Sequence, residues 1–340
     1  MTRSLLAFLA ATVALPVFAQ DQQLSGELNL YSSRHYDTDE RLYSDFEEMT
    51  GVTINRIEGN ADELIARMEA EGANSPADVL LTVDTSRLHR ADEAGLLQSV
   101  DSEILEERIP AQYQDDENQW FGFSLRSRII FFDKEAVENP PQTYADLAND
   151  EYEGMICIRS STNTYNQTLL ASIIENEGEE AAREWAQGIV ENMARDPQGG
   201  DTDQLLGLVS GECSIAVSNT YYFARALASD VDGLTGNTDQ VGWVFPNQDS
   251  TGAHVNLSGG GVAANAPNRE NAVAFLEYLA SDSAQQYFAA GNNEYPVVES
   301  VETTAAVQQL GDFTADDVKL SSVAENLETA NRIFAEVGWE

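Results

Sequence analysis

Tyrosines that stand between a strand and a helix are the residues of this 340-residue chain best placed to do chemistry together. Tyr221 and Tyr222 follow the apolar run 213–217 and open an expected helix, with Asn219 or Thr220 as its N-cap. Neighbours on a helix point about 100° apart, so an isolated pair is ordinarily one core ring and one surface ring. The alternative is that both hydroxyls lie at a cleft edge, where the positive end of the helix lowers the cost of a phenolate.

Two further tyrosines occupy the same setting. Tyr36, preceded by His35, and Tyr165 each lie where an expected strand turns into an expected helix. In parallel α/β sheets, the carboxyl ends of the strands and the N-termini of the helices border the ligand crevice. Taken alone, His35 and Tyr36 are ordinary loop residues. Four of the twelve tyrosines at such turns nevertheless predict a common site.

Four phenol oxygens suit a small, highly charged, hard cation. Tyrosine ordinarily titrates at about pH 10, so ionising several together requires a strong compensating positive charge. Hard cations prefer oxygen donors, and ferric ion is the natural candidate for phenolate. Zinc and copper favour cysteine or several histidines, of which the chain has three in all. Calcium and magnesium would instead use carboxylates.

The segments around these tyrosines resemble the periplasmic ferric-ion-binding proteins, the substrate-binding components of iron(III) ABC importers. The resemblance extends over nearly the whole chain after residue 19 and rests on YSSRHY at 31–36, IRSSTNTYNQ at 158–167, GDTDQ at 200–204, NTYY at 219–222 and FPNQ at 245–248. It implies a clamshell of the transferrin-like class that closes on one ferric ion and delivers it to an ABC permease of the inner membrane. It also implies a binding protein, not an enzyme, which we expect to be a monomer.

The resemblance further assigns roles to individual residues. Tyr165, Tyr221 and Tyr222 would bind the metal from the second lobe, and Tyr36 from the first. His35 matches a position that ligates iron in some members of the family and not in others.

An anion completes the metal shell in some relatives, and three arginines could hold one here. Arg126 is the first candidate, followed by Arg225 and Arg34. Each could equally offset phenolate charge or form a plain salt bridge.

The elements expected to position these residues alternate between strand and helix. Strands are expected at 27–31, 52–57 and 77–83, and helices at 38–49, 61–71 and 85–94. This alternation predicts a parallel sheet covered by helices on both faces. Further strands are expected at 120–132, 155–159, 213–217, 241–246 and 251–264, and further helices at 143–147, 167–175, 181–193, 201–209, 268–280, 283–288 and 316–338.

The expected fold is therefore α/β, a two-lobe clamshell of the type II periplasmic-binding-protein kind. The length favours two lobes over one domain, and each lobe would hold a mostly parallel sheet flanked by helices. The N-terminal lobe would comprise residues 20–123 and 249–298, and the C-terminal lobe residues 124–248 and 299–340. Two crossing strands would join the lobes. The triple glycine at 259–261 could form an anion-binding nest, but we prefer a bend in a strand that crosses between the lobes.

The two cysteines, Cys157 and Cys213, each lie in an expected strand. In an oxidising compartment such a pair favours a disulfide, which would stabilise the fold by about 4 kcal/mol. Two buried thiols are the alternative. Neither cysteine has a histidine beside it in the sequence, which argues against a catalytic thiol.

The first 19 residues have the pattern of a signal peptide. Arg3 provides the positive region, Leu5 to Val17 the apolar region, and Ala19 the cleavage site before Gln20, so we expect export to the periplasm. The 18 basic and 58 acidic residues leave a net charge of −40, which should repel nucleic acid and anionic membranes. We interpret this acidity as an adaptation to a saline environment.

Two other functions remain as alternatives to ferric-ion binding. A protein of the same fold could bind an organic cation or an oxyanion, such as a polyamine, thiamine or phosphate, because aromatic pairs can stack on an amine. A secreted hydrolase is the other alternative. The sequence contains no Gly-x-Ser-x-Gly, His-Glu-x-x-His or Ser-x-x-Lys motif, and only His35, His89 and His254 could serve as a base.

Overall fold

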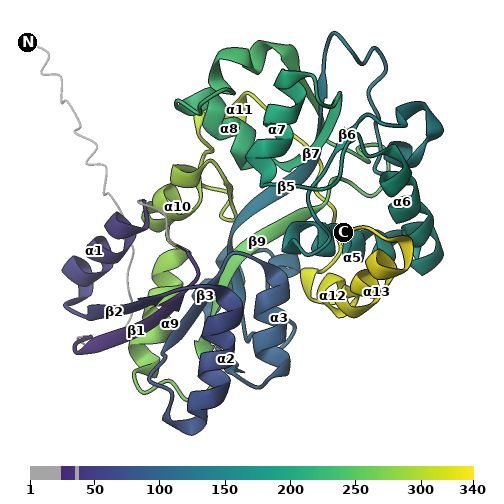
Figure 1. The fold of residues 1–340 in the computed structure, drawn as a ribbon. Coiled ribbons are helices and arrows are strands. Elements are labelled where there is room, and N and C mark those ends of the chain that lie inside the picture. The colour runs from purple at the N-terminus through teal and green to yellow at the C-terminus, as the bar shows by residue number, and fades with distance from the viewer. Residues whose placement is uncertain (1–23, 35–37) are drawn as a thin grey trace, which may run out of the picture.

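Two sheets that share one long strand organise the molecule (Figure 1). The computed structural model describes residues 24–34 and 38–340. Its main strand order is β2-β1-β3-β9-β5-β7-β6. The strands of this order are β1 (Glu27–Ser32), β2 (Thr53–Glu58), β3 (Val79–Thr82), β5 (Phe121–Asp133), β6 (Ile156–Cys157), β7 (Ile215–Asn219) and β9 (Val255–Ala263). Three more strands pair with them off this path: β4 (Leu97–Gln98), β8 (Val241–Val244) and β10 (Tyr295–Pro296).

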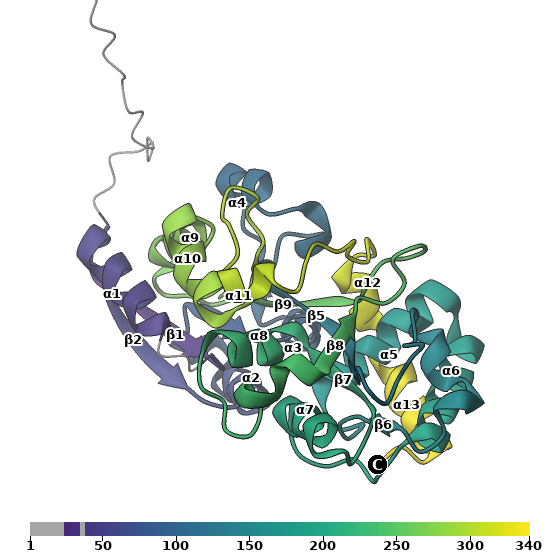
Figure 2. The ribbon, with the colours of Figure 1, turned by 90° about the horizontal axis from the view of Figure 1, so that it is seen from above.

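The first lobe is built on the parallel strands that the sequence pattern predicts. β1 pairs in parallel with both β2 and β3. Helices lie on both faces of this sheet, with α9 on one side and α2 and α3 on the other (Figures 1 and 2). The helices of this lobe are α1 (Asp39–Thr50), α2 (Ala61–Glu71), α3 (Thr85–Glu93), α4 (Glu103–Arg108), α9 (Arg269–Leu279) and α10 (Asp282–Phe288).

The second lobe repeats the arrangement on a smaller sheet. β6 pairs in parallel with β7, and β7 and β8 pair antiparallel with β5. Its helices are α5 (Thr164–Glu177), α6 (Glu179–Asn192), α7 (Asp201–Ser210), α8 (Thr220–Ala228), α11 (Ala305–Gln308), α12 (Leu320–Glu325) and α13 (Leu327–Val337). The two-lobe fold that the sequence predicts is therefore present.

β5 passes from one sheet into the other. Residues 121–127 pair with β9, whereas residues 128–133 pair with β7 and β8. Within β9, the triple glycine lies in continuous strand, paired with β3 and with the start of β5 in the first-lobe sheet, and not at a bend between the lobes. There is no room for side chains there. A Cβ on Gly260 would lie 2.5 Å from Leu81 Cδ2, and one on Gly261 would lie 2.3 Å from the carbonyl oxygen of Gln119.

Several predicted boundaries are wrong, for local reasons. The helix expected from residue 167 begins at Thr164, because the Asn163 side chain caps it by accepting a hydrogen bond from the Tyr165 amide. The helix expected from residue 316 begins only at Leu320. Asp316 is held to α5 by hydrogen bonds from Ser172 and Asn176, which keeps the chain before Leu320 out of the helix. The helix expected at 143–147 is a 3-10 turn, Ala145–Ala148.

Among the described residues, no helix is both long enough and apolar enough to cross a membrane. The expected signal peptide lies outside the described residues.

Candidate metal centre

Tyr221 and Tyr222 lie in the first turn of α8, directly after β7. Asn219 is the N-cap residue, as the sequence suggests, although its side chain makes no capping hydrogen bond. The two rings lie with their centroids 4.2 Å apart and their planes tilted by 30°. Tyr221 is 4% exposed and Tyr222 is partly buried, so the pair is not one core ring and one surface ring.

Tyr165 meets this pair from another helix. It lies in the first turn of α5, and its hydroxyl oxygen is 3.2 Å from that of Tyr221, within hydrogen-bond distance. Two strand-to-helix turns that lie 56 residues apart in the sequence therefore converge. The structure thus brings Tyr165, Tyr221 and Tyr222 together. His35 and Tyr36 lie outside the described residues, so their part in the site stays a prediction.

A cavity of about 540 Å³ is lined by residues of the first lobe and, from the second lobe, by Thr164, the residue before Tyr165. Ser33 and Arg34, at the end of β1, line it from the first lobe together with Asp84, and Thr164 lines it from the second. Ser33 and Arg34 directly precede His35 and Tyr36 in the sequence. The cavity therefore lies between the residues that precede His35 and Tyr36 and the start of α5.

Three arginines surround the Tyr165 ring. The guanidinium carbons of Arg126, Arg128 and Arg159 lie 5.6, 6.0 and 5.5 Å from its centroid. Arg126 is 2% exposed, donates to Ser258 Oγ and to the carbonyl of Val83, and its Nε has no hydrogen-bond partner among the described residues. Each of these arginines also pairs with a buried carboxylate: Arg126 with Asp84 at 3.8 Å, and Arg128 and Arg159 with Asp201 at 3.0 and 3.6 Å.

The other two candidate arginines lie in different settings. Arg34 is buried, pairs with Asp39 at 2.9 Å and with Glu294 at 3.7 Å, and stacks on the Phe288 ring. Arg225 is exposed in the last turn of α8, with its guanidinium 5.6 Å from the centroid of Tyr222. Arg34 is therefore already engaged with two carboxylates, whereas Arg126 has one carboxylate partner, Asp84.

Ionisation of the Tyr222 hydroxyl is unfavourable without a compensating cation. The pKa of Tyr222 is raised, first by burial and then by the nearby Tyr165 and Asp201, while a hydrogen bond with Tyr221 and the charge of Arg159 act in the opposite direction. The described residues contain no group of three or more His, Cys, Asp and Glu side chains that could hold a metal. The phenol oxygens of Tyr165, Tyr221 and Tyr222 are hard donors of the kind that suits a hard cation.

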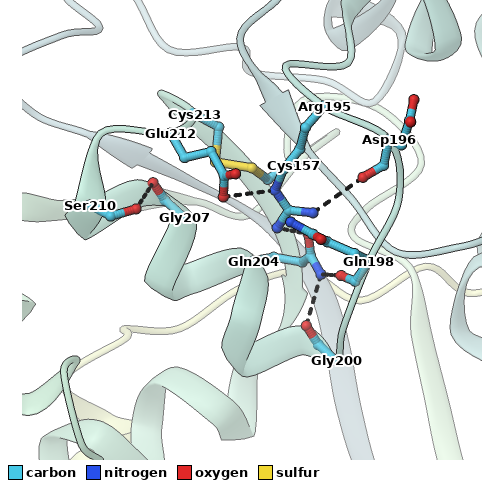
Figure 3. Close-up of a disulfide and its surroundings, with 10 residues drawn as sticks. All are labelled: Cys157, Arg195, Asp196, Gln198, Gly200, Gln204, Gly207, Ser210, Glu212 and Cys213. Atoms are coloured by element: carbon cyan, nitrogen blue, oxygen red, sulfur yellow. Dashed lines mark hydrogen bonds and ion pairs between the residues drawn. A yellow bond between two sulfur atoms is a disulfide. The ribbon is translucent and has the colours of Figure 1, made fainter.

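A disulfide joins the strands that lead to these tyrosines, as the sequence led us to expect. Cys157 ends β6, before the turn to Tyr165, and Cys213 precedes β7, with their Cα atoms 5.8 Å apart (Figure 3). The bridge packs on α7, where a Cβ on Gly207 would lie 2.9 Å from Cys213 Sγ.

Sequence reasoning missed the ion pair beside the site. Arg128, in β5, and Asp201, at the start of α7, are 2% and 0% exposed and lie 3.0 Å apart. The sequence signal for this pair was that Arg128 is a charged residue next to the apolar residues at the end of β5. Nothing local connects it to a carboxylate 73 residues away.

Comparisons with known proteins agree with this architecture. Residues 41–315 match the family model described as bacterial extracellular solute-binding protein. Iron uptake protein A1 of Synechocystis is 47% identical over 315 residues, covering 92% of this chain and 88% of the relative. Iron uptake protein A2 of the same organism is 44% identical over 93% of this chain and 91% of the relative.

Solved structures match over the same range. A Trichodesmium protein in complex with iron and citrate ligands superposes with a TM-score of 0.89 at 48% identity, covering 92% of this chain and all of the other. The ferric binding protein of Campylobacter jejuni superposes with a TM-score of 0.86 at 40% identity, with the same coverage. The chain therefore belongs to the bacterial extracellular solute-binding proteins and, among them, to the ferric-ion-binding group that its tyrosine turns resemble.

Proposed function

We propose that this protein captures ferric ion in the cleft between its lobes and delivers it to an ABC permease. The observation that carries the proposal is the convergence of Tyr165 on Tyr221, with their hydroxyl oxygens 3.2 Å apart and the Tyr222 ring in contact. The relatives named for iron uptake and ferric-ion binding support the choice of cargo.

Tyr165, Tyr221 and Tyr222 are the proposed ligands from the second lobe, and Tyr36 and His35 the proposed ligands from the first. Each phenol that binds ferric ion must release its proton, so iron affinity should fall as the pH falls. Arg126, with its unpartnered Nε, is the proposed contact for an anion that accompanies the metal. The citrate bound with iron in the Trichodesmium relative supports a carboxylate as that anion.

We also propose the lobe boundaries given above, 20–123 with 249–298 and 124–248 with 299–340. The change of β5 partners supports a first crossing within this strand, although it comes after residue 127, four residues beyond the proposed boundary. Near the C-terminus, α13 packs on α5 and α6, whereas α12 contacts both α5 and α3 of the first lobe. Cleavage after Ala19 and export to the periplasm are proposed with them, and the extracellular assignment of the family supports export.

Removing a single phenol oxygen tests the ligand set. Tyr221→Phe or Tyr222→Phe should weaken ferric binding by more than about 100-fold, beyond the usual effect of an outer-shell change. The measurement is competition with ferric citrate, followed through the visible phenolate-to-iron charge-transfer band. Tyr278→Phe is the control, because the Tyr278 hydroxyl is buried in α9 without a hydrogen-bond partner among the described residues.

Two results would contradict the proposal. The first is a colourless wild-type protein after incubation with ferric citrate. The second is thermal stabilisation by thiamine, a polyamine or phosphate without any metal, which would favour the organic-cation or oxyanion alternative.

A further inference from the structure

We propose that Arg128, together with Asp201, is a positioning residue that sets the separation of the Tyr165 turn and the Tyr221–Tyr222 turn. The inference rests on the proposed ferric-ion function, because the separation matters only if one ligand contacts both turns. One guanidinium group contacts the backbone or side chains of both turns directly. Figure 1 shows β5, which carries Arg128, in the middle of the molecule beside β7.

On one side, the Arg128 guanidinium forms hydrogen bonds with the start of α5. Its Nε and Nη2 donate to Asn166 Oδ1 at 3.1 and 2.8 Å. Asn166 in turn donates to the carbonyl oxygens of Arg159 and Ser160 at 2.7 and 3.2 Å. Since Asn166 follows Tyr165 directly, these bonds fix the turn from the end of β6 into α5.

On the other side, the same group holds the start of α8. Arg128 Nη1 donates to both Asp201 oxygens, at 3.2 and 3.0 Å, and to Asn219 Oδ1 at 3.3 Å. Asp201 Oδ2 accepts the Asn219 backbone N–H at 2.8 Å. Asn219 is the N-cap of α8 and stands two residues before Tyr221. The ion pair therefore fixes where the second tyrosine turn begins.

A gain in stability does not by itself explain why Arg128 and Asp201 are buried as an ion pair. Both side chains are withdrawn from water, and the desolvation of two charges offsets much of their attraction. A buried pair of this kind serves better to specify one arrangement of its neighbours. The planar fork is what allows Arg128 to serve both turns at once, and a lysine ammonium at the same place could not reproduce it.

A second arginine of the same lobe provides a matched control. Arg195 pairs with Glu212 at 2.9 Å and donates to Gln204 of α7 at 3.1 Å (Figure 3). Like Arg128, it is largely buried, with 11% of its side chain exposed, and it contacts α7. Among the described residues, however, its hydrogen-bond and ion-pair partners lie in neither tyrosine turn.

The experiment compares Arg128→Lys with Arg195→Lys in the full exported chain, with ferric citrate as the iron source. Arg128→Lys keeps the charge and loses the fork. We expect it to weaken iron binding by about 10- to 100-fold, the usual cost of an outer-shell change, and to move the charge-transfer band. Arg195→Lys should leave both the affinity and the band unchanged. Melting temperatures of the iron-free proteins are measured in parallel.

Three results would overturn the positioning role while wild-type protein binds iron. In the first, Arg128→Lys binds iron with wild-type affinity and colour. In the second, both lysine variants lose iron affinity to the same extent, in proportion to the drop in their melting temperatures, and the charge-transfer band does not move. If Arg128→Lys does not fold, Asp201→Asn takes its place, and wild-type behaviour of that variant is the third. A wild-type protein that binds no iron would instead overturn the proposed function itself.

Discussion

Tyr222 and His254 are both titratable, and packing around α8 and β5 withdraws both from water. Burial raises the pKa of the tyrosine and lowers that of the histidine, because in each case the charged form is the one that loses hydration. At Tyr222 a bound cation can compensate the negative charge of the phenolate. At His254 the neighbouring charges belong to Arg128 and Arg126, which lower the pKa further, to about 3.

His254 should make the fold sensitive to mild acid. Its folded pKa of about 3 lies below the ordinary 6.5, so the unfolded chain binds a proton that the folded chain does not. The free energy of unfolding is therefore unaffected by this histidine above about pH 6.5 and decreases as the pH falls toward 3. The decrease amounts to about 2 kcal/mol between pH 6.5 and 5. His254→Gln should flatten the pH dependence of the free energy of unfolding, measured by urea denaturation. His89→Gln, on α3, is the control, and parallel curves for His254→Gln and wild type would contradict the prediction.

At the scale of elements, most strands and helices were predictable and the partners of their side chains were not. Helix α2 begins at Ala61 and ends at Glu71, as its apolar spacing predicts, and the tyrosine turns follow from the order of strand and helix. Arg128 and Asp201 lie on different elements, and their contact depends on how β5 and α7 pack. His35 and Tyr36 remain predictions, because local sequence marks their turn without placing their side chains.

The disulfide should stabilise the elements that carry the second-lobe tyrosines. It closes a loop between residues separated by 56 positions, which predicts about 4 kcal/mol of stabilisation through the unfolded state. The double variant Cys157→Ala, Cys213→Ala should therefore unfold at a lower urea concentration than the oxidised wild type. Dithiothreitol should lower the midpoint of the wild type and leave that of the double variant unchanged. Equal midpoints for the oxidised wild type and the double variant would contradict the prediction.

At the scale of the whole molecule, charge is the dominant surface property. With 58 acidic and 18 basic residues, 40 acidic side chains would stay uncompensated even if every basic residue formed an ion pair with one acidic residue. Self-repulsion of this kind destabilises the compact state. Exposed ion pairs oppose it only weakly, since each contributes about 0–1 kcal/mol.

Salt should therefore stabilise this protein. Raising sodium chloride from about 0.1 to 1 M shortens the screening length from about 10 to 3 Å, so the melting temperature should rise. Sucrose at matched osmolality, which does not screen charge, is the control for general solute effects. A melting temperature that stays constant or falls with salt would contradict both this prediction and the saline interpretation of the composition.

β5 belongs to both sheets, since its residues 121–127 pair with β9 and its residues 128–133 with β7 and β8. Every residue from Phe121 to Phe131 is buried. Melting either lobe would remove hydrogen bonds from a strand on which the other lobe also depends. The two lobes should therefore unfold as one cooperative unit, and the amide protons in the middle of β5 should exchange with solvent among the slowest in the chain.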